Sequence, residues 1–227
     1  MQVKEKCMGI AQAVLIALVI LTGAIAVPIL FRPFFYLHIK PLDLPAQTGL
    51  TVAEIKTAYK EMMQYCIGLS DTFSVGVLPF SESGAAHFAD VRRLFILDLW
   101  VLAISAVLLG ASYFFKKRPR LGGHTPGFWS TVGLGAILAM VGGLAALDFD
   151  RAFTVFHKLC FPGKDNWIFR RYKDPVIDML PEEFFRSCAI VIFALIALSC
   201  TGLILWDKKK KQGRGRLPFV GEGQCPS

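Results

Sequence analysis

The chain has 227 residues, of which 54% are hydrophobic and 19% are charged, and its mean hydropathy is +0.51. Soluble domains carry about a quarter charged residues, so this composition excludes a soluble globular protein. The six cysteines are too few and too irregularly spaced for a secreted disulfide scaffold. The net charge of +8 does not form one patch but is divided between three short segments, so a nucleic-acid partner is not expected.

Four apolar segments predict membrane-spanning helices, and their approximate bounds are 8–31, 94–115, 128–147 and 188–206. Each is about 20 residues long, which is the length at which an α-helix crosses a hydrocarbon core of roughly 30 Å. The sequence therefore predicts an all-α membrane protein with four transmembrane helices, in which residues 1–227 form a single integral membrane domain. We also expect the outer loops 32–93 and 148–187 to build an extracytoplasmic helical cap.

The first apolar segment has a second interpretation, because Ala24-Ile25-Ala26 fits the small-residue pattern of a signal-peptide cleavage site. The apolar stretch continues to Phe31, which is longer than a signal peptide requires. We expect a retained helix, with a cleaved signal peptide as the alternative.

Residues 51–67 of the first loop predict an amphipathic helix, because Thr51 and Glu54 have the spacing of a capping box. The apolar positions share one face: Val52, Ile55, Tyr59, Met62 and Cys66. Such a helix lies on the membrane surface, caps the bundle or packs in a small outer domain. The next long helix is expected to begin at Ser81 or Ser83 as N-cap.

The third span is predicted to continue past Leu147 as a straight helix. Two stripes support this prediction: Phe149, Phe153, Phe156 and Cys160 on one face, and Asp150, Thr154 and His157 on another. Phe161-Pro162-Gly163 is expected to end the helix.

Basic residues indicate the orientation of the chain in the membrane. Three segments hold 12 of them against three acidic residues: Lys4 and Lys6; Lys116, Lys117, Arg118 and Arg120; and Lys208, Lys209, Lys210, Lys211, Arg214 and Arg216 in the tail 207–227. The two long loops between them are nearly neutral. Because cytoplasmic loops carry the excess of Lys and Arg, we expect cytoplasmic N- and C-termini. The same basic residues are also compatible with contact to anionic lipids.

Two of the four histidines are predicted to meet. The loop 116–127 is short, so the second and third spans form an antiparallel hairpin whose outer ends are neighbours. His87 and His157 then lie about 10 Å and about 15 Å above the apolar boundary by helical rise. The alternative is that both are surface histidines that contact only water or nearby carboxylates. His38 is expected at the interface and His124 in a solvated loop.

Other chemistry has little support in the sequence. There is no HExxH, CxxC or GxSxG motif, so zinc-protease, redox and serine-hydrolase interpretations are not favoured, and we expect no metal and no cofactor. Asp90, one turn from His87, is expected to orient or charge that imidazole.

The stretch Leu147-Asp-Phe-Asp-Arg-Ala-Phe-Thr-Val-Phe-His157-Lys158 resembles a signature of the lipoprotein intramolecular transacylase (Lit) family. The resemblance continues through Phe161-Pro162, Asn166-Trp167, Asp174-Pro175 and the segment from Leu180 to Phe185. A shorter signature lies at His87-Phe-Ala-Asp90-Val91.

The resemblance implies a bacterial cell-membrane enzyme, typical of Gram-positive species, that acts on diacylglyceryl-modified lipoproteins. Such an enzyme moves the sn-2 acyl chain from glycerol to the α-amine of the same cysteine and leaves a lyso-form lipoprotein. In this family the two matching histidines are the catalytic candidates, here His87 and His157, and they lie at the outer leaflet.

This chemistry needs a base near neutral pH, because the attacking amine has a pKa of about 8 and is largely protonated. We predict His157 as the base, and His87 as the group that stabilises the oxyanion or protonates the leaving oxygen. The predicted substrate-binding residues are Arg92, Asp90, Asp150, Phe153 and Trp167. The aromatic residues among them are expected to hold acyl chains or simply to pack.

Two other classes of function remain open. One is a non-enzymatic membrane receptor or assembly protein. The other is a lipid hydrolase or an acyltransferase that acts between separate molecules.

Overall fold

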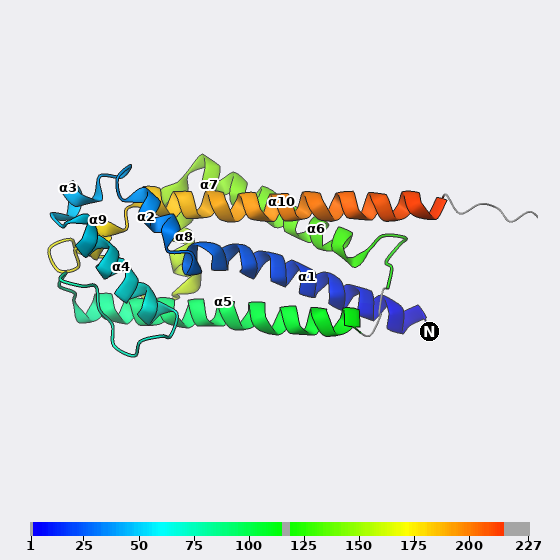
Figure 1. Ribbon diagram of the computed structural model, residues 1–227, viewed down its shortest axis with the longest axis horizontal. Helices are drawn as coiled ribbons and strands as arrows, with labels where there is room; N and C mark the ends of the chain where they lie inside the picture. Colours follow the sequence, from blue (N-terminus) through cyan, green and yellow to red (C-terminus); the bar gives the residue numbers. More distant parts are fainter. Residues whose placement is uncertain (1, 115–118, 216–227) are drawn as a thin grey trace, which may run out of the picture.

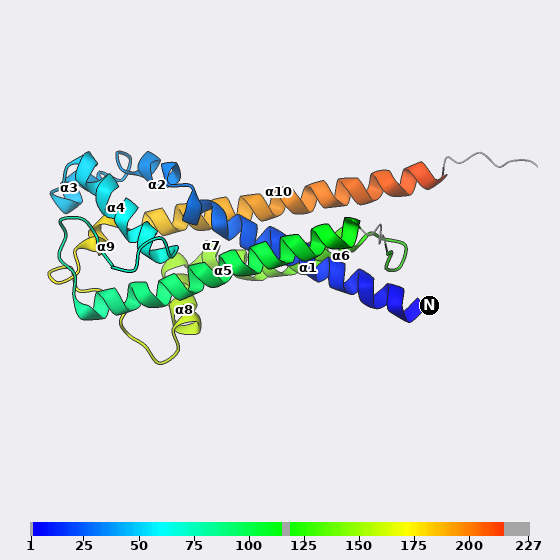
Figure 2. The same cartoon turned by 60° about the horizontal axis from the view of Figure 1, so that its bottom comes forward.

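The computed structural model describes residues 2–114 and 119–215, and every regular element in these residues is a helix. Three long helices run along the molecule: α1 (Gln2–Leu30), α5 (Glu82–Phe114) and α10 (Glu182–Gly215). In Figures 1 and 2 they lie side by side, and α1 packs against both α5 and α10. The predicted cytoplasmic residues Lys116, Lys117, Arg118 and Arg216, with the rest of the tail from 216, lie outside the described residues.

The third span consists of three consecutive pieces. They are α6 (Pro126–Ile137), the π-helical turn η1 (Leu138–Gly142) and α7 (Gly143–Leu147). Four described helical stretches are long and apolar enough to cross a membrane: Val3–Leu30, Glu82–Phe114, Pro126–Leu147 and Glu182–Gln212. The prediction of an all-α protein with four transmembrane helices is confirmed.

Four short helices gather at one end of the bundle, opposite the N-terminus (Figure 1), and we call them the end layer. They are α2 (Pro33–His38), α3 (Leu44–Thr48), α4 (Val52–Cys66) and α9 (Val176–Met179). The predicted capping box is present, since Thr51 and Glu54 exchange hydrogen bonds at the start of α4. The apolar face of α4 packs into a small core, where Tyr59 stacks on Phe35 with ring centroids 3.8 Å apart. That the end layer lies on the extracytoplasmic side of the membrane stays a prediction.

The expectation of a straight helix past Leu147 is wrong. Asp148 adopts an extended backbone (φ −156°, ψ 95°), and its side chain accepts a hydrogen bond from the Arg151 N–H at 2.9 Å. A new helix, α8 (Phe149–Cys160), therefore begins here with Asp148 as its N-cap. Figures 1 and 2 show α8 running across the direction of the long helices, so its height cannot be obtained by extending the third span.

Asp148→Ala is expected to destabilise α8 by about 1 kcal/mol, because it removes the side-chain acceptor at the helix N-terminus. Asp148→Asn keeps such an acceptor and is the matched control. Hydrogen exchange of residues 149–160 measures the effect. Equal protection of α8 in both variants would contradict the capping role.

His124 is not the solvated loop residue that the sequence suggested. Its Nδ1 donates a hydrogen bond to Asp207 at 2.8 Å, and its Nε2 accepts one from the Lys211 ammonium at 2.9 Å. The Asp207 carboxylate also accepts from the Thr125 N–H at 2.7 Å. These contacts attach the start of α6 to the last turns of α10, which a charge pattern alone does not reveal.

Candidate functional site

The first two turns of α5 place His87. Ser81 is the N-cap, as its hydroxyl accepts a hydrogen bond from the Gly84 N–H at 3.0 Å. The Asp174 carboxylate accepts from both the N–H and the hydroxyl of Ser81, at 2.7 and 2.8 Å. A Cβ at Gly84 would collide with that carboxylate, so only glycine allows Asp174 to approach this closely. The start of α5 is thereby fixed to the segment that follows α8.

The last turns of α8 place His157. Its Nδ1 lies 2.8 Å from the carbonyl oxygen of Phe153. Because a carbonyl can only accept, Nδ1 carries the proton of the neutral imidazole. The Nε2 lone pair is therefore free to act as a base.

The two imidazoles come together, as the sequence predicted. The ring centroids of His87 and His157 are 6.0 Å apart, and both side chains are buried. Six aromatic rings contact them, and two of these belong to the adjacent residues Phe88 and Phe156. We call the other four the aromatic box: Phe153, Phe161, Trp167 and Phe169. The Phe153 and Trp167 rings lie 4.2 and 4.9 Å from that of His157, so two predicted substrate-binding residues do reach the pair.

Burial in this box lowers the pKa of His157, because the charged imidazolium loses hydration, although the hydrogen bond to the Phe153 carbonyl raises it in part. The ring is therefore neutral at neutral pH. A neutral imidazole with a fixed Nδ1 proton can take a proton at Nε2, and a second imidazole nearby can donate one or stabilise a negative oxygen.

Asp90 connects α5 to the loop after α8. Its carboxylate accepts two hydrogen bonds from the Lys164 ammonium, at 2.6 and 2.7 Å, and a third from the Asn166 amide at 3.2 Å. Arg93 contacts the same carboxylate at 3.3 Å. We call Asp90, Lys164 and Asn166 the Asp90 latch. No hydrogen bond from Asp90 to His87 occurs in the described residues, so Asp90 does not orient the imidazole directly. Its negative charge still acts on the ring, because it partly offsets the lowering of the His87 pKa by burial.

Sequence reasoning missed Lys164 and Asn166 as parts of the site. Asn166-Trp167 belongs to the motif that resembles the family, and that was the available signal. Asn166 Oδ1 and His87 Nδ1 are two of the three buried side-chain atoms without a hydrogen-bond partner among the described residues, Asp98 Oδ2 being the third. One of these atoms belongs to the imidazole pair and the other to the residue before Trp167, and unsatisfied polar atoms of this kind are what a site that binds a polar ligand would show.

Arg92 lies away from the pair. Its guanidinium donates to the Ser70 carbonyl at 2.6 Å and to Asp71 at 3.0 Å, and it covers the Tyr65 ring at 4.8 Å. It thus fixes the first loop to α5, and contact with a substrate stays a prediction.

Asp150 and Phe153 of α8 line a cleft of about 610 Å³. Apolar and acidic side chains both line the cleft, and the acidic ones are Asp43, Asp150, Asp178, Glu182 and Glu183. Asp178 is paired with Arg171 at 3.2 Å. Because Phe153 also contacts the His157 ring, this cleft adjoins the imidazole pair.

Residues 10–185 match the protein family described as lipoprotein intramolecular transacylase Lit. No curated protein matches the chain. Among solved structures, the membrane integral lipoprotein intramolecular transacylase Lit from Bacillus cereus is similar at a TM-score of 0.81 and 28% identity, over 94% of this chain and 100% of that one. Structures of two variants of the Bacillus cereus protein, with one histidine replaced by arginine or by alanine, each give a TM-score of 0.74 at 27% identity. They cover 93% and 92% of this chain and 95% and 96% of their own chains.

Proposed function

The chain belongs to the lipoprotein intramolecular transacylase family, and on that premise we propose that it moves the sn-2 acyl chain of a diacylglyceryl-modified lipoprotein to the α-amine of the same cysteine. The observation that carries the proposal is the pair of buried imidazoles, 6.0 Å apart, with the Nδ1 proton of His157 held by a backbone carbonyl. One ring is prepared to accept a proton, and the other lies within reach of the same reacting atoms.

In the proposed reaction, the α-ammonium group first releases one proton to solvent. The neutral nitrogen then attacks the sn-2 ester carbonyl, and His157 Nε2 removes a second proton from it. His87 stabilises the oxyanion of the tetrahedral intermediate. The carbon–oxygen bond to glycerol then breaks, and a proton returns from an imidazole to the leaving oxygen. The products are an amide and a free sn-2 hydroxyl, with the number of acyl chains unchanged. Because amine and ester belong to one molecule, the enzyme mainly has to hold them in contact.

The surroundings of the pair support a lipid substrate with a cationic end. We propose that Phe153 and Trp167 pack against the acyl chain near the scissile ester. Asp150 and the other carboxylates that line the adjoining cleft would attract the α-ammonium group before it is deprotonated. The proposed orientation, with cytoplasmic termini, puts the imidazole pair at the outer leaflet, where the lipid anchor of a lipoprotein lies.

A crossover experiment tests the proposal. Two synthetic diacylglyceryl lipopeptides, which differ in peptide mass and carry isotopically different sn-2 chains, are mixed with the purified protein in lipid vesicles. We expect N-acylated lyso-products in which each peptide keeps its own label, as measured by tandem mass spectrometry. Exchanged labels would indicate transfer between molecules, and loss of a chain would indicate hydrolysis. Unchanged substrates would favour a non-enzymatic binding protein.

The lowered pKa of His157 gives a pH prediction. Its basic form persists below the ordinary histidine pKa of about 6.5, so the loss of activity that is due to His157 protonation should occur below that pH. Trp167→Ala should admit water to the box, raise the pKa of His157 and move this loss to higher pH, whereas Trp167→Phe should not. An NMR titration of histidine-labelled protein, with the His157 signal assigned from a His157→Asn sample, measures the shift. An unchanged titration in Trp167→Ala would contradict the role of the box.

A further inference from the structure

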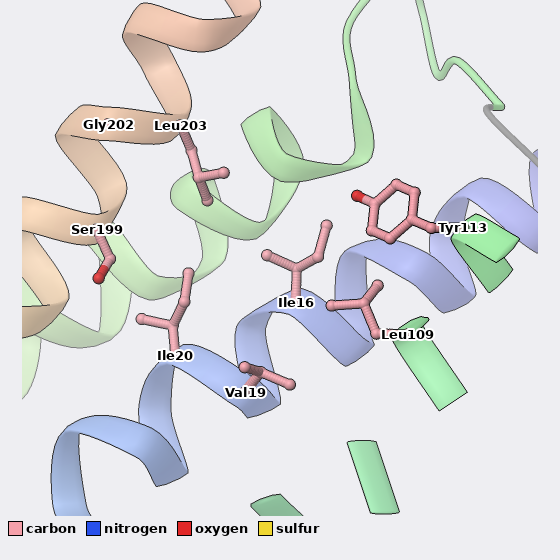
Figure 3. A pocket seen from close by; sticks show the side chains of 8 residues that line it. All are labelled: Ile16, Val19, Ile20, Leu109, Tyr113, Ser199, Gly202 and Leu203. Atoms are coloured by element: carbon pink, nitrogen blue, oxygen red, sulfur yellow. The ribbon is translucent and has the colours of Figure 1, made fainter. Parts of the chain in front are cut away.

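A second hollow lies between the long helices, in the half of the bundle opposite to the imidazole pair. It is a groove of about 370 Å³, and Figure 3 shows its three walls. Ile16, Val19 and Ile20 of α1 form the floor, with Leu203, Gly202 and Ser199 of α10 on one side and Leu109 and Tyr113 of α5 on the other. We call this hollow the α1 groove.

The lining of the α1 groove suits hydrocarbon. Apart from Tyr113, its side chains are aliphatic or small, and the Ser199 hydroxyl is satisfied by the Leu195 carbonyl at 2.8 Å. All three walls belong to helices long and apolar enough to span the membrane. Water does not fill an apolar hollow at that depth, so an acyl chain of the surrounding lipid is the group that can occupy it.

Positive charge lies beyond one end of the groove. Lys209 and Lys210 follow Gly202 and Leu203 by seven residues, which places them on the same face of α10 and about 10 Å further along it. Both lysines are exposed, and the Lys210 ammonium covers the Trp206 ring at 5.2 Å. Asp207 does not neutralise them at the surface, because its carboxylate is buried against Thr125 and His124.

From this arrangement we propose that the α1 groove binds one acyl chain of an anionic phospholipid, whose headgroup lies against Lys209 and Lys210. The lipid fills the space between α5 and α10 and contacts both. Its binding does not depend on the proposed acyl transfer, since none of these residues belongs to the imidazole pair, the aromatic box or the Asp90 latch. In the proposed orientation it comes from the cytoplasmic leaflet.

The groove offers a selective variant with a matched control. A Cβ at Gly202 meets no atom within 4 Å, so the backbone leaves room for a side chain to begin here, and Gly202→Leu adds one to the lining of the groove. Gly133 in α6 is also exposed and equally free of neighbours, but it does not line the groove. Gly133→Leu therefore adds the same side chain to a spanning helix elsewhere.

The full chain is reconstituted in vesicles of equal parts phosphatidylglycerol and phosphatidylcholine, and the lipid retained per protein is measured by native mass spectrometry. We expect one phosphatidylglycerol, enriched about thirtyfold over phosphatidylcholine, which is the scale of effect that two lysines near an anionic headgroup provide. Gly202→Leu should lose this lipid, while Gly133→Leu should keep it.

The double variant Lys209→Gln/Lys210→Gln changes only exposed side chains and should keep a lipid but lose the preference for phosphatidylglycerol. It tests the headgroup contact even if Gly202→Leu does not fold. Equal retention of the two lipids by the unmodified chain would overturn the proposal. So would a lipid complement unchanged in folded Gly202→Leu, or a preference unchanged in the double variant.

Discussion

His157→Asn is expected to lower kcat for acyl transfer by about 10²- to 10⁴-fold, the usual contribution of a general base. An asparagine amide can still donate to the Phe153 carbonyl, so the local fold should persist, but it has no basic nitrogen to replace Nε2. His87→Asn should also lower kcat, because it removes the group that stabilises or protonates the reacting oxygen. Mass spectrometry of the lipopeptide product under single-turnover conditions measures both rates.

His38 provides a matched control, since its Nδ1 lies at the same 2.8 Å distance from the carbonyl of the residue four positions earlier, Phe34. His38 is on α2 in the end layer and does not contact the imidazole pair. His38→Asn is therefore expected to leave kcat within about twofold of the unmodified chain. Full activity in both His157→Asn and His87→Asn would refute the proposed enzyme and favour a binding protein.

Asp90→Asn is expected to lower kcat by about 10²-fold with little change in KM. The carboxylate holds Lys164 and Asn166, and its loss frees the loop that carries Phe161 and Trp167. A displacement of about 1 Å in the surroundings of a reacting group can cost this much in rate. We therefore propose a positioning role for Asp90, in place of the direct substrate contact predicted from the sequence.

Asp71→Asn is the control for a lost ion pair, because the Asp71 side chain is fully exposed in its contact with Arg92. Surface pairs of this kind contribute little, so Asp71→Asn should retain both kcat and stability. If Asp90→Asn raised KM instead and left kcat unchanged, direct contact with the substrate would be the better explanation.

Local signals in the sequence were sufficient for most of the helices. Hydropathy located the four spans, and the Thr51 and Glu54 spacing located α4, because both features depend on residues within one segment. The convergence of His87 and His157 was predicted, but from a packed hairpin of the second and third spans that the structure does not show. In the described residues α5 packs mainly against α1, and α6 packs against α1 and α10.

The break at Asp148 had a local signal that the hydrophobic periodicity outweighed. Aspartate is a favoured N-cap residue, yet the phenylalanine spacing from 149 to 156 continues smoothly from the third span. The sequence could not resolve this, because both a straight and a broken helix preserve the same apolar stripe.

Contacts between segments that are distant in the chain could not be predicted from the sequence. Lys164 and Asp90 are 74 residues apart, and Asp207 and His124 are 83 apart. His124 was expected in a solvated loop and Asp90 beside His87, because no pattern within either segment indicates a partner so far along the chain. Only the packing of the loops shows that they are paired.

The turn of the chain at Asp148 determines the direction from which a lipid could arrive. Three apolar side chains of α8 are exposed: Val155, Phe156 and Leu159. The helix that carries His157 therefore presents an apolar face at the side of the molecule rather than a lid over the site. Pulling an acyl chain into water costs about 0.8 kcal/mol per methylene. A substrate that reaches the site along this apolar face, within the plane of its leaflet, would avoid that cost. The acyl chains that anchor the substrate would then stay in the bilayer during catalysis.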